Sequence, residues 1–159
     1  MAAKPVSELI IDIDKAPMRT GTSYPAQFSK FGDGRIKHAL GDAVGLTRYG
    51  VNMVRMPAGT ISSARHWHAR QDEFIYILEG EVVLVTDEGE TVIGPGTAVG
   101  FPAGNANGHH LINRSDSDVV LLEVGDRTPG DQVTYSDIDM LNTDVDGKRV
   151  FSRKDGTPY

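Results

Sequence analysis

Short runs of apolar and β-branched residues recur along the middle of the chain, and turns rich in Gly and Pro separate them. Such runs are typical of β-strands. The strands predicted in this way cover residues 46–56, 60–68, 73–78, 81–86, 90–93, 97–101, 108–113 and 119–124. Nothing between 46 and 124 has the apolar period of a useful amphipathic helix. This pattern predicts an all-β domain of antiparallel sheets, arranged as a sandwich or a barrel.

One connection is especially short, because only Glu79 and Gly80 separate two of the predicted strands. We therefore expect residues 73–78 and 81–86 to pair as a β-hairpin.

The flanking segments have a weaker pattern. Residues 1–45 are predicted to form an N-terminal arm with edge strands, for which residues 9–11, 28–31 and 35–40 are the candidates. Residues 46–124 would form the barrel core. Residues 125–159 contain one predicted strand, at 132–135, and should pack as an extended arm on the barrel or on a neighbouring subunit. At 159 residues the chain is expected to be a single domain.

Composition narrows the possible partners. The 16 basic and 22 acidic residues give a net charge of −6, without the basic stripe of a nucleic-acid-binding surface. The apolar run at residues 9–11 is too short for a signal sequence or a membrane span, so we expect no membrane partner and a cytoplasmic protein. There is no cysteine, so any metal must be held by imidazole and oxygen ligands.

Such ligands occur close together in one stretch, where His66 and His68 lie one residue apart and Glu73 follows after a predicted turn. Residues two apart in a strand point to the same face, so both imidazoles should project together while Trp67 points away. Either His109 or His110 could supply a fourth ligand from a distant strand. A His-x-His pair alone is as often two solvated side chains, but the glutamate and the remote histidines favour a metal site. Imidazole and carboxylate suit one divalent ion such as Zn, Fe, Mn or Ni.

The spacing of these residues resembles the two sequence motifs of the cupin superfamily. Gly59, His66, His68, Glu73 and Gly80 occur in the order of the first motif. The second motif corresponds to Gly96, Pro102-Ala103-Gly104, His109 and Asn113. The resemblance covers residues 54–123, with one extra residue before His66 and two before His109, both in predicted turns that tolerate insertions. Beyond the motifs, the chain is similar to a group of bacterial single-domain cupins that has no assigned function.

The resemblance implies a double-stranded β-helix, also called a jelly-roll barrel, made of two antiparallel sheets and usually dimeric. It assigns the metal ligands to His66, His68, Glu73 and His109. His109 keeps the motif's spacing to Asn113, and strand alternation would turn His110 to the opposite face. Cupins include dioxygenases, isomerases, epimerases, decarboxylases, lyases and binding proteins, so the fold does not select a reaction.

Strand alternation also predicts the wall of a substrate pocket. Because Glu73 should point inward, Ile75 and Ile77 should do the same. The same argument places Ser62 beside the first two histidines and Leu111 beside the third. No general base is evident among the inward residues, and the catalytic residues are unknown at this point.

The strand at 46–56 can face inward in two ways. The favoured phase turns inward Arg48, Asn52, Val54 and Met56. The other phase turns inward Tyr49, Val51, Met53 and Arg55. We favour the first because it supplies a cation that could anchor a carboxylate or phosphate.

Two functions follow as hypotheses. The first is a metal-dependent enzyme whose substrate is a sugar, a hydroxy or keto acid, or a diol, chelated at the metal for dioxygenase or isomerase and epimerase chemistry. The alternative is a non-catalytic module that binds a sugar or a carboxylate. We also expect a homodimer that uses the outward residues Phe74, Tyr76 and Leu78.

Overall fold

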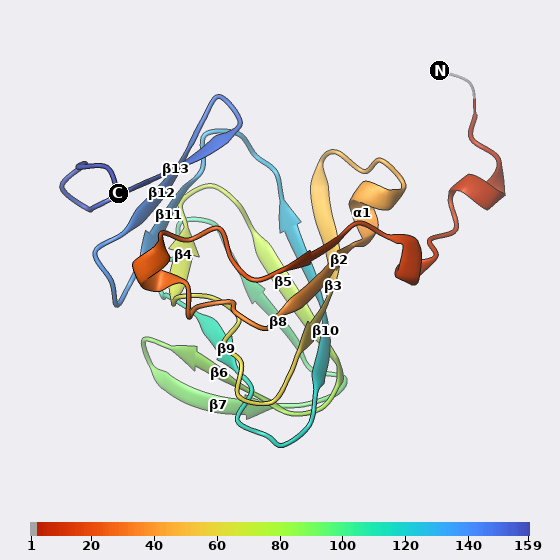
Figure 1. Ribbon diagram of the computed structural model, residues 1–159, viewed down its shortest axis with the longest axis horizontal. Helices are drawn as coiled ribbons and strands as arrows, with labels where there is room; N and C mark the ends of the chain where they lie inside the picture. Colours follow the sequence, from red (N-terminus) through yellow and green to blue (C-terminus); the bar gives the residue numbers. More distant parts are fainter. Residues whose placement is uncertain (1–2) are drawn as a thin grey trace.

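The computed structural model describes residues 3–159, and its strands form three antiparallel sheets (Figure 1). The largest has six strands, in the order β1-β2-β3-β10-β5-β8. These strands are β1 (Met18–Thr20), β2 (Ile36–Ala39), β3 (Tyr49–Met56), β10 (Val119–Asp126), β5 (Glu73–Glu79) and β8 (Ala98–Phe101). Strand β10 lies between β3 and β5 and pairs with both along most of its length. Antiparallel pairing and a mostly β fold were both predicted.

The remaining strands form two smaller sheets. One contains β13 (Lys148–Ser152), β12 (Leu141–Val145), β11 (Gln132–Tyr135) and β4 (His66–His68), and the other contains β7 (Gly89–Ile93), β6 (Val82–Thr86) and β9 (His110–Ile112). Isolated bridges join Ile61 to Ile112 and His66 to His109. The structure therefore has three sheets where two were predicted. One of the bridges pairs His66 with His109, which are two of the predicted metal ligands.

The predicted hairpin between residues 73–78 and 81–86 is wrong. Strand β5 pairs with β10 and β8, whereas β6 pairs with β7 and β9 in another sheet. Gly80 makes this change of sheet possible, since its φ is +77° and a Cβ atom would lie 2.6 Å from the Asp118 carbonyl oxygen. A short turn at a sheet-to-sheet crossing has the same local sequence as a hairpin turn.

Two of the three predicted N-terminal edge strands are wrong. Residues 9–11 form no strand and follow a 3₁₀ helix at Val6–Glu8, and residues 28–31 form the end of another, at Ala26–Phe28, and the turn after it. Further 3₁₀ residues are Ile13–Lys15, and the one α-helix of residues 3–159 is α1 (Leu40–Ala43). The prediction at 35–40 corresponds to β2, and that at 60–68 shortens to β4.

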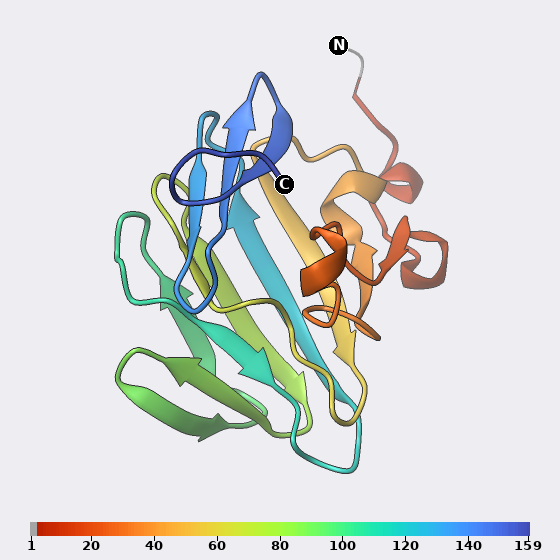
Figure 2. The ribbon, with the colours of Figure 1, turned by 60° about the vertical axis from the view of Figure 1, so that its left-hand side comes forward.

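The C-terminal extension is more ordered than predicted. Strand β11 was expected, but β12 and β13 were not, and the three continue the sheet that begins with β4. A second apolar cluster, which contains Val133, Tyr135 and Met140, joins this sheet to Tyr24 and Phe28 of the N-terminal arm. In the ribbon views the orange segment around Ala26–Phe28 lies near these strands, whereas the red start of the arm lies on the side of α1 (Figures 1 and 2).

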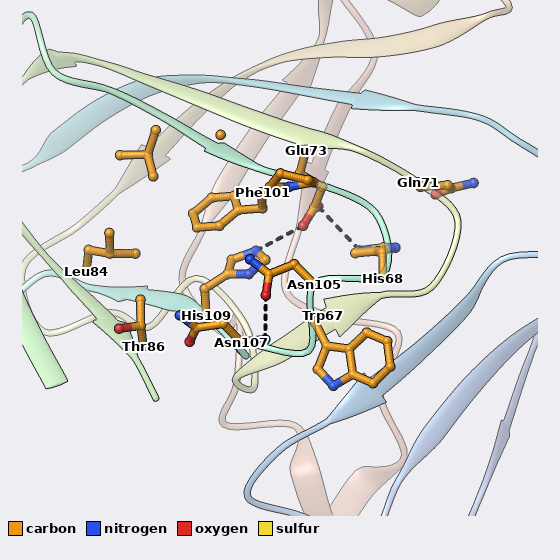
Figure 3. Close-up of a pocket in the computed structure, with 13 residues that line it drawn as sticks. Trp67, His68, Gln71, Glu73, Leu84, Thr86, Phe101, Asn105, Asn107 and His109 are labelled. Atoms are coloured by element: carbon orange, nitrogen blue, oxygen red, sulfur yellow. Dashed lines mark hydrogen bonds and ion pairs between the residues drawn. The ribbon is translucent and has the colours of Figure 1, made fainter. Parts of the chain in front are cut away.

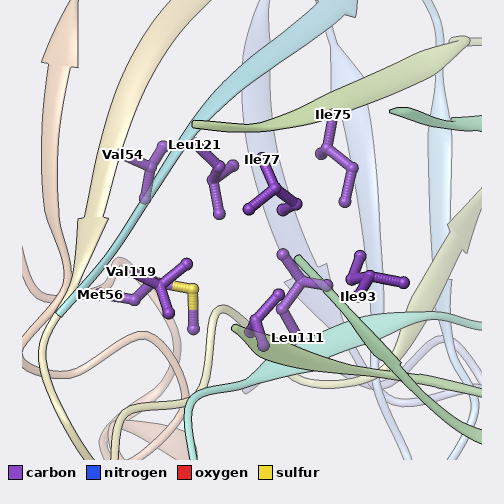
Figure 4. Packing of buried hydrophobic residues seen from close by; sticks show 9 residues of the cluster. Val54, Met56, Ile75, Ile77, Ile93, Leu111, Val119 and Leu121 are labelled. Carbon is purple, nitrogen blue, oxygen red and sulfur yellow. The ribbon is translucent and has the colours of Figure 1, made fainter. Parts of the chain in front are cut away.

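The main hydrophobic core lies between the six-stranded sheet and the sheet of β6, β7 and β9 (Figure 4). Its buried members are Val54, Met56, Ile75, Ile77, Val82, Ile93, Leu111, Val119 and Leu121. The alternation along β5 is as predicted, because Ile75 and Ile77 are buried while Phe74, Tyr76 and Leu78 are exposed. That these three residues form a dimer contact stays a prediction. Among residues 3–159, no helix is long and apolar enough to cross a membrane.

Candidate metal centre and cavity

Backbone pairing brings three histidines and a glutamate together. His66 and His109 lie opposite each other and exchange two backbone hydrogen bonds, of 3.1 and 2.9 Å. Residues paired in this way point their side chains to the same face. His68 follows two residues later on β4, and Glu73 begins β5. The strand pairing therefore brings the four predicted ligands close together.

The Glu73 carboxylate is the centre of the cluster (Figure 3). Its Oε2 atom lies 3.0 Å from His109 Nε2 and 3.5 Å from His66 Nε2, and its Oε1 atom lies 3.4 Å from His68 Nε2. The ligand atoms of His66, His68 and Glu73 all lie within 4.8 Å of one another. All four side chains are largely shielded from solvent.

Two of the imidazoles are held in one orientation by bonds at Nδ1. The His66 Nδ1 atom lies 2.9 Å from the Ala64 carbonyl oxygen, and His68 Nδ1 lies 2.6 Å from Asp131 Oδ2. Carbonyl and carboxylate oxygens only accept hydrogen bonds, so both Nδ1 atoms must donate. Each ring therefore presents Nε2 toward Glu73. A histidine ligand commonly donates its other nitrogen to such an oxygen, which fixes the ring and raises its basicity.

The residues fit a metal ion by the orientation of their rings and by the distances between their ligand atoms. Imidazole nitrogens bind zinc and similar ions at about 2.0–2.1 Å, so two ligand atoms lie about 3.0 Å apart at a right angle and about 3.4 Å apart at a tetrahedral angle. Two contacts of Glu73, at 3.0 and 3.4 Å, lie in that range, and the third, at 3.5 Å, is slightly longer. His109 Nδ1 is buried without a hydrogen-bond partner among the described residues. The ring is instead held by stacking on Phe101, with centroids 3.5 Å apart.

The electrostatics of the metal-free cluster concentrate charge on Glu73. Burial raises the pKa of this carboxyl, but hydrogen bonds from His109, His66 and His68 outweigh it and hold the pKa well below its ordinary value. Burial lowers the pKa of His68, yet Glu73 and Asp131 overcome it and raise the pKa to about 9. For His109, burial dominates and lowers the pKa.

The cluster separates two cavities. The smaller, of about 190 Å³, is lined by Trp67, Leu84, Phe101 and Asn105 among others, and the larger measures about 900 Å³. His68, Glu73 and His109 contribute to both walls. Trp67 contributes to the wall of the smaller cavity, and its indole points away from Glu73 (Figure 3).

The predicted pocket residues divide into three groups. The larger cavity is lined by Asn52, Met56, Ser62, Ile75 and Leu111. Ile77 is fully buried in the core and does not reach either cavity. Arg48 is exposed, precedes β3 and lines neither cavity, so the prediction that it points into the pocket is wrong. The strand alternation holds only from Tyr49 onward, and Arg48 lies outside it.

His110 has different contacts from His109. Its Nδ1 atom lies 3.0 Å from the Ser63 carbonyl oxygen, and its neighbours include the charged groups of Asp137 and Arg65. Burial lowers its pKa. The nitrogen that reaches Glu73 belongs to His109.

Sequence reasoning missed three polar residues of the site, which are Asp131, Glu123 and Lys37. Asp131 is almost fully buried and also accepts a hydrogen bond from the Arg70 amide. Glu123 lines the larger cavity, where its Oε1 atom accepts hydrogen bonds from Lys37 Nζ at 2.5 Å and Asn52 Nδ2 at 3.3 Å. A local signal existed for Glu123, because it is the one charged residue in the apolar run 119–124.

Comparison with known proteins establishes the family. The Cupin domain family matches residues 52–125. A crystal structure described as a sugar phosphate isomerase from a cupin superfamily, from Silicibacter pomeroyi DSS-3, is 46% identical, with a TM-score of 0.90 over 94% of this chain and 96% of that one. The chain belongs to the cupin superfamily. The resemblance of its two histidine-containing segments to the cupin motifs is thereby confirmed.

Other solved structures resemble this cupin less closely. A candidate sugar phosphate isomerase from Acidithiobacillus ferrooxidans ATCC 23270 is 29% identical, with a TM-score of 0.72 over 79% of this chain and 80% of that one. The polyketide cyclase RemF from Streptomyces resistomycificus is 20% identical over 81% of this chain and 85% of that one, with a TM-score of 0.64, which shows a shared fold alone. No curated protein matches this cupin significantly.

Proposed function

We propose that this cupin is a metal-dependent isomerase that acts on a small phosphorylated sugar. One observation carries the proposal: the histidine–glutamate cluster opens onto a cavity of about 900 Å³ that also contains a carboxylate outside the cluster, that of Glu123. The similarity to a sugar phosphate isomerase over nearly the whole chain supports this reaction over the dioxygenase chemistry that the ligand types also permit.

The ion would be held by His66, His68, Glu73 and His109. A divalent ion held there would supply Lewis acidity to the oxygen atoms of a bound substrate. Zn, Fe, Mn and Ni all accept this mixture of imidazole and carboxylate. Asp131 positions His68, and the Ala64 carbonyl positions His66.

The fourth ligand can be tested by a matched pair of variants. His109→Ala should lose metal binding, whereas His110→Ala should keep it, because only His109 directs a nitrogen at Glu73. Isothermal titration with Zn²⁺ or Mn²⁺ measures both. The reverse result would transfer the ligand role to His110.

Glu123 is placed to move the proton of the isomerisation. It is paired with Ile75 across the sheet, and Ile75 shares a face of β5 with Glu73, so both carboxylates point to the same side. Interconversion of an aldose and a ketose moves one proton between neighbouring carbons and another between their oxygens, with no atom gained or lost. The Glu123 carboxylate would accept the carbon-bound proton and return it to the next carbon, while Lys37 and Asn52 fix its position.

The experiment is proton exchange measured by NMR. Metal-loaded protein is incubated in D₂O with a panel of sugar phosphates, and loss of the C–H signal beside the carbonyl is followed. Glu123→Gln should slow exchange by about 10²–10⁴-fold and leave metal content unchanged. Glu90→Gln, which alters an exposed carboxylate paired with Arg114, is the matched control.

The outcomes separate the candidate functions. Exchange on a sugar phosphate supports the isomerase. Oxygen uptake by iron-loaded protein with a hydroxy acid, keto acid or diol would replace it with a dioxygenase. Tight binding of a sugar or carboxylate, without exchange or oxygen uptake, would identify a non-catalytic module.

A further inference from the structure

Several basic side chains line the larger cavity, although the protein as a whole has a net charge of −6. Five basic side chains line it: Arg19, Arg35, Lys37, Arg127 and Arg149. Three of them form ion pairs, Lys37 with Glu123 and both Arg19 and Arg127 with Asp42. Within residues 3–159, Arg35 and Arg149 have no carboxylate within 4.0 Å. These two arginines can therefore pair with an anion from outside.

Arg35 is held in place from the backbone. Its Nη1 atom donates a 2.5 Å hydrogen bond to the carbonyl oxygen of Ser62, and its side chain is partly buried. A Cβ atom at Gly32 would lie 3.3 Å from both Arg35 Nη2 and the Ser62 oxygen, so the glycine leaves room for the guanidinium. This bond occupies one donor of the guanidinium and leaves the others for a ligand.

Both arginines line the larger cavity together with Tyr24. Arg149 shares a face of β13 with Phe151, whose ring lies 5.9 Å from the Tyr24 ring. Burial raises the pKa of the Tyr24 hydroxyl, while the positive charges of Arg35 and Arg149 lower it. The Tyr24 and Tyr135 rings are 5.5 Å apart in an edge-to-face contact, and Tyr135 lies 5.9 Å from the His66 ring. Two aromatic rings thus connect the arginines to the candidate metal cluster.

We propose that Arg35, Arg149 and the Tyr24 hydroxyl form a subsite for the phosphate group of the substrate. Two guanidinium groups and a hydroxyl match the several oxygens and the double charge of a phosphate monoester. The substrate would place its phosphate here and its carbonyl and hydroxyl oxygens at the cluster, with its carbon chain along Tyr135. This assignment rests on the proposed isomerase function for the far end of the substrate, but the subsite can be tested without it.

The first test uses metal-free protein and inorganic phosphate, measured by calorimetry at low ionic strength. Wild-type protein should bind phosphate, and Arg149→Gln should weaken binding at least fivefold without lowering the melting temperature, because Arg149 is exposed. The double variant Arg35→Gln/Arg149→Gln should lose binding. Arg55→Gln, which alters an exposed arginine paired with Asp118 outside both cavities, is the control. No binding by wild-type protein, or an equal loss in the control, overturns the subsite.

The second test fixes the chemical class of the ligand. Metal-loaded protein is titrated with fructose 6-phosphate and fructose, and with glycerol phosphate and glycerate. Each phosphate ester should bind at least tenfold more tightly than its partner, and Arg149→Gln should reduce that preference. Glycerate bound as tightly as glycerol phosphate would overturn the phosphate assignment in favour of a carboxylate. Phosphate selectivity without proton exchange on any sugar phosphate would leave the subsite and refute the isomerase.

Discussion

The inward face of strand β5 is apolar at one end and ionised at the other. Ile77 is 0% exposed and Ile75 is 6% exposed, and both belong to the main core. Glu73, two residues before Ile75 on the same face, contacts three histidines and has a pKa well below its ordinary value. Burying the isoleucines favours folding by about 1.5–3 kcal/mol each, whereas burying a charge opposes it unless partners compensate. One end of the strand therefore buries apolar surface, and the other buries a carboxylate whose desolvation is compensated by three histidines.

Removing one of the metal ligands around Glu73 should abolish metal binding. We expect His66→Ala to abolish metal binding, because the ring presents Nε2 to Glu73 and is oriented by Ala64. Elemental analysis and titration with Zn²⁺ measure this loss. His38→Ala, in the histidine outside the two clusters, is the control. Unchanged occupancy in His66→Ala would show that the ligands are assigned wrongly.

Removing a core side chain at the other end of β5 should instead lower the free energy of unfolding. Ile77→Ala is expected to reduce the free energy of unfolding by about 2–5 kcal/mol, because the cavity left behind adds to the lost apolar burial. Urea denaturation measures it, with Leu78→Ala, on the exposed face, expected to stay within about 0.5 kcal/mol of wild type. Metal stoichiometry should be the same in both variants. A loss of metal in Ile77→Ala would mean that the two ends are not independent.

Stability of the metal-free protein should fall as the pH rises above neutrality. The pKa of His68 is about 9 in the folded protein, above its ordinary 6.5, so the folded state binds this proton more tightly than the unfolded state. The stabilisation is complete below pH 6.5 and is lost as the pH rises through about 9. Its size is on the order of 3 kcal/mol. Urea denaturation at several pH values measures it, and His68→Ala should lack this slope. A wild-type slope of the opposite sign would contradict the assigned contacts with Glu73 and Asp131.

The smallest effect is expected at Asp131, which touches the cluster only through His68. Asp131→Asn should weaken metal binding by about 10–100-fold, or about 1.4–2.7 kcal/mol, while leaving one ion per chain. The amide keeps the shape of the carboxylate but supplies less charge to the His68 ring. Competition titration against a chelating dye resolves a change of this size. An affinity equal to that of wild type would remove Asp131 from the site.

The same contrast explains what the sequence could predict. The core and the cluster follow from alternation, because Ile75, Ile77 and the pair His66 and His68 need only a strand of known phase. Asp131 could not be found in this way, since its role depends on the pairing of β11 with β4. Asp131 and His68 are 63 residues apart in the sequence. Lys37 likewise reaches Glu123 only through the pairing of β2, β3 and β10.

The errors have a related cause. The false hairpin and the misplaced Arg48 both came from extending a local pattern across a point where the backbone changes direction. A turn of two residues does not reveal which sheet the next strand joins, and alternation does not apply to a residue that precedes its strand. Long-range strand pairing decides both, and the local pattern of a single sequence does not reveal that pairing.

Metal analysis of protein purified without added metal shows directly whether the histidine–glutamate cluster binds an ion. We expect about one divalent ion per chain, and a fall in melting temperature on chelation that readdition of the ion reverses. Protein that carries no metal, and that gains no thermal stability from Zn²⁺, Mn²⁺, Fe²⁺ or Ni²⁺, would contradict this expectation.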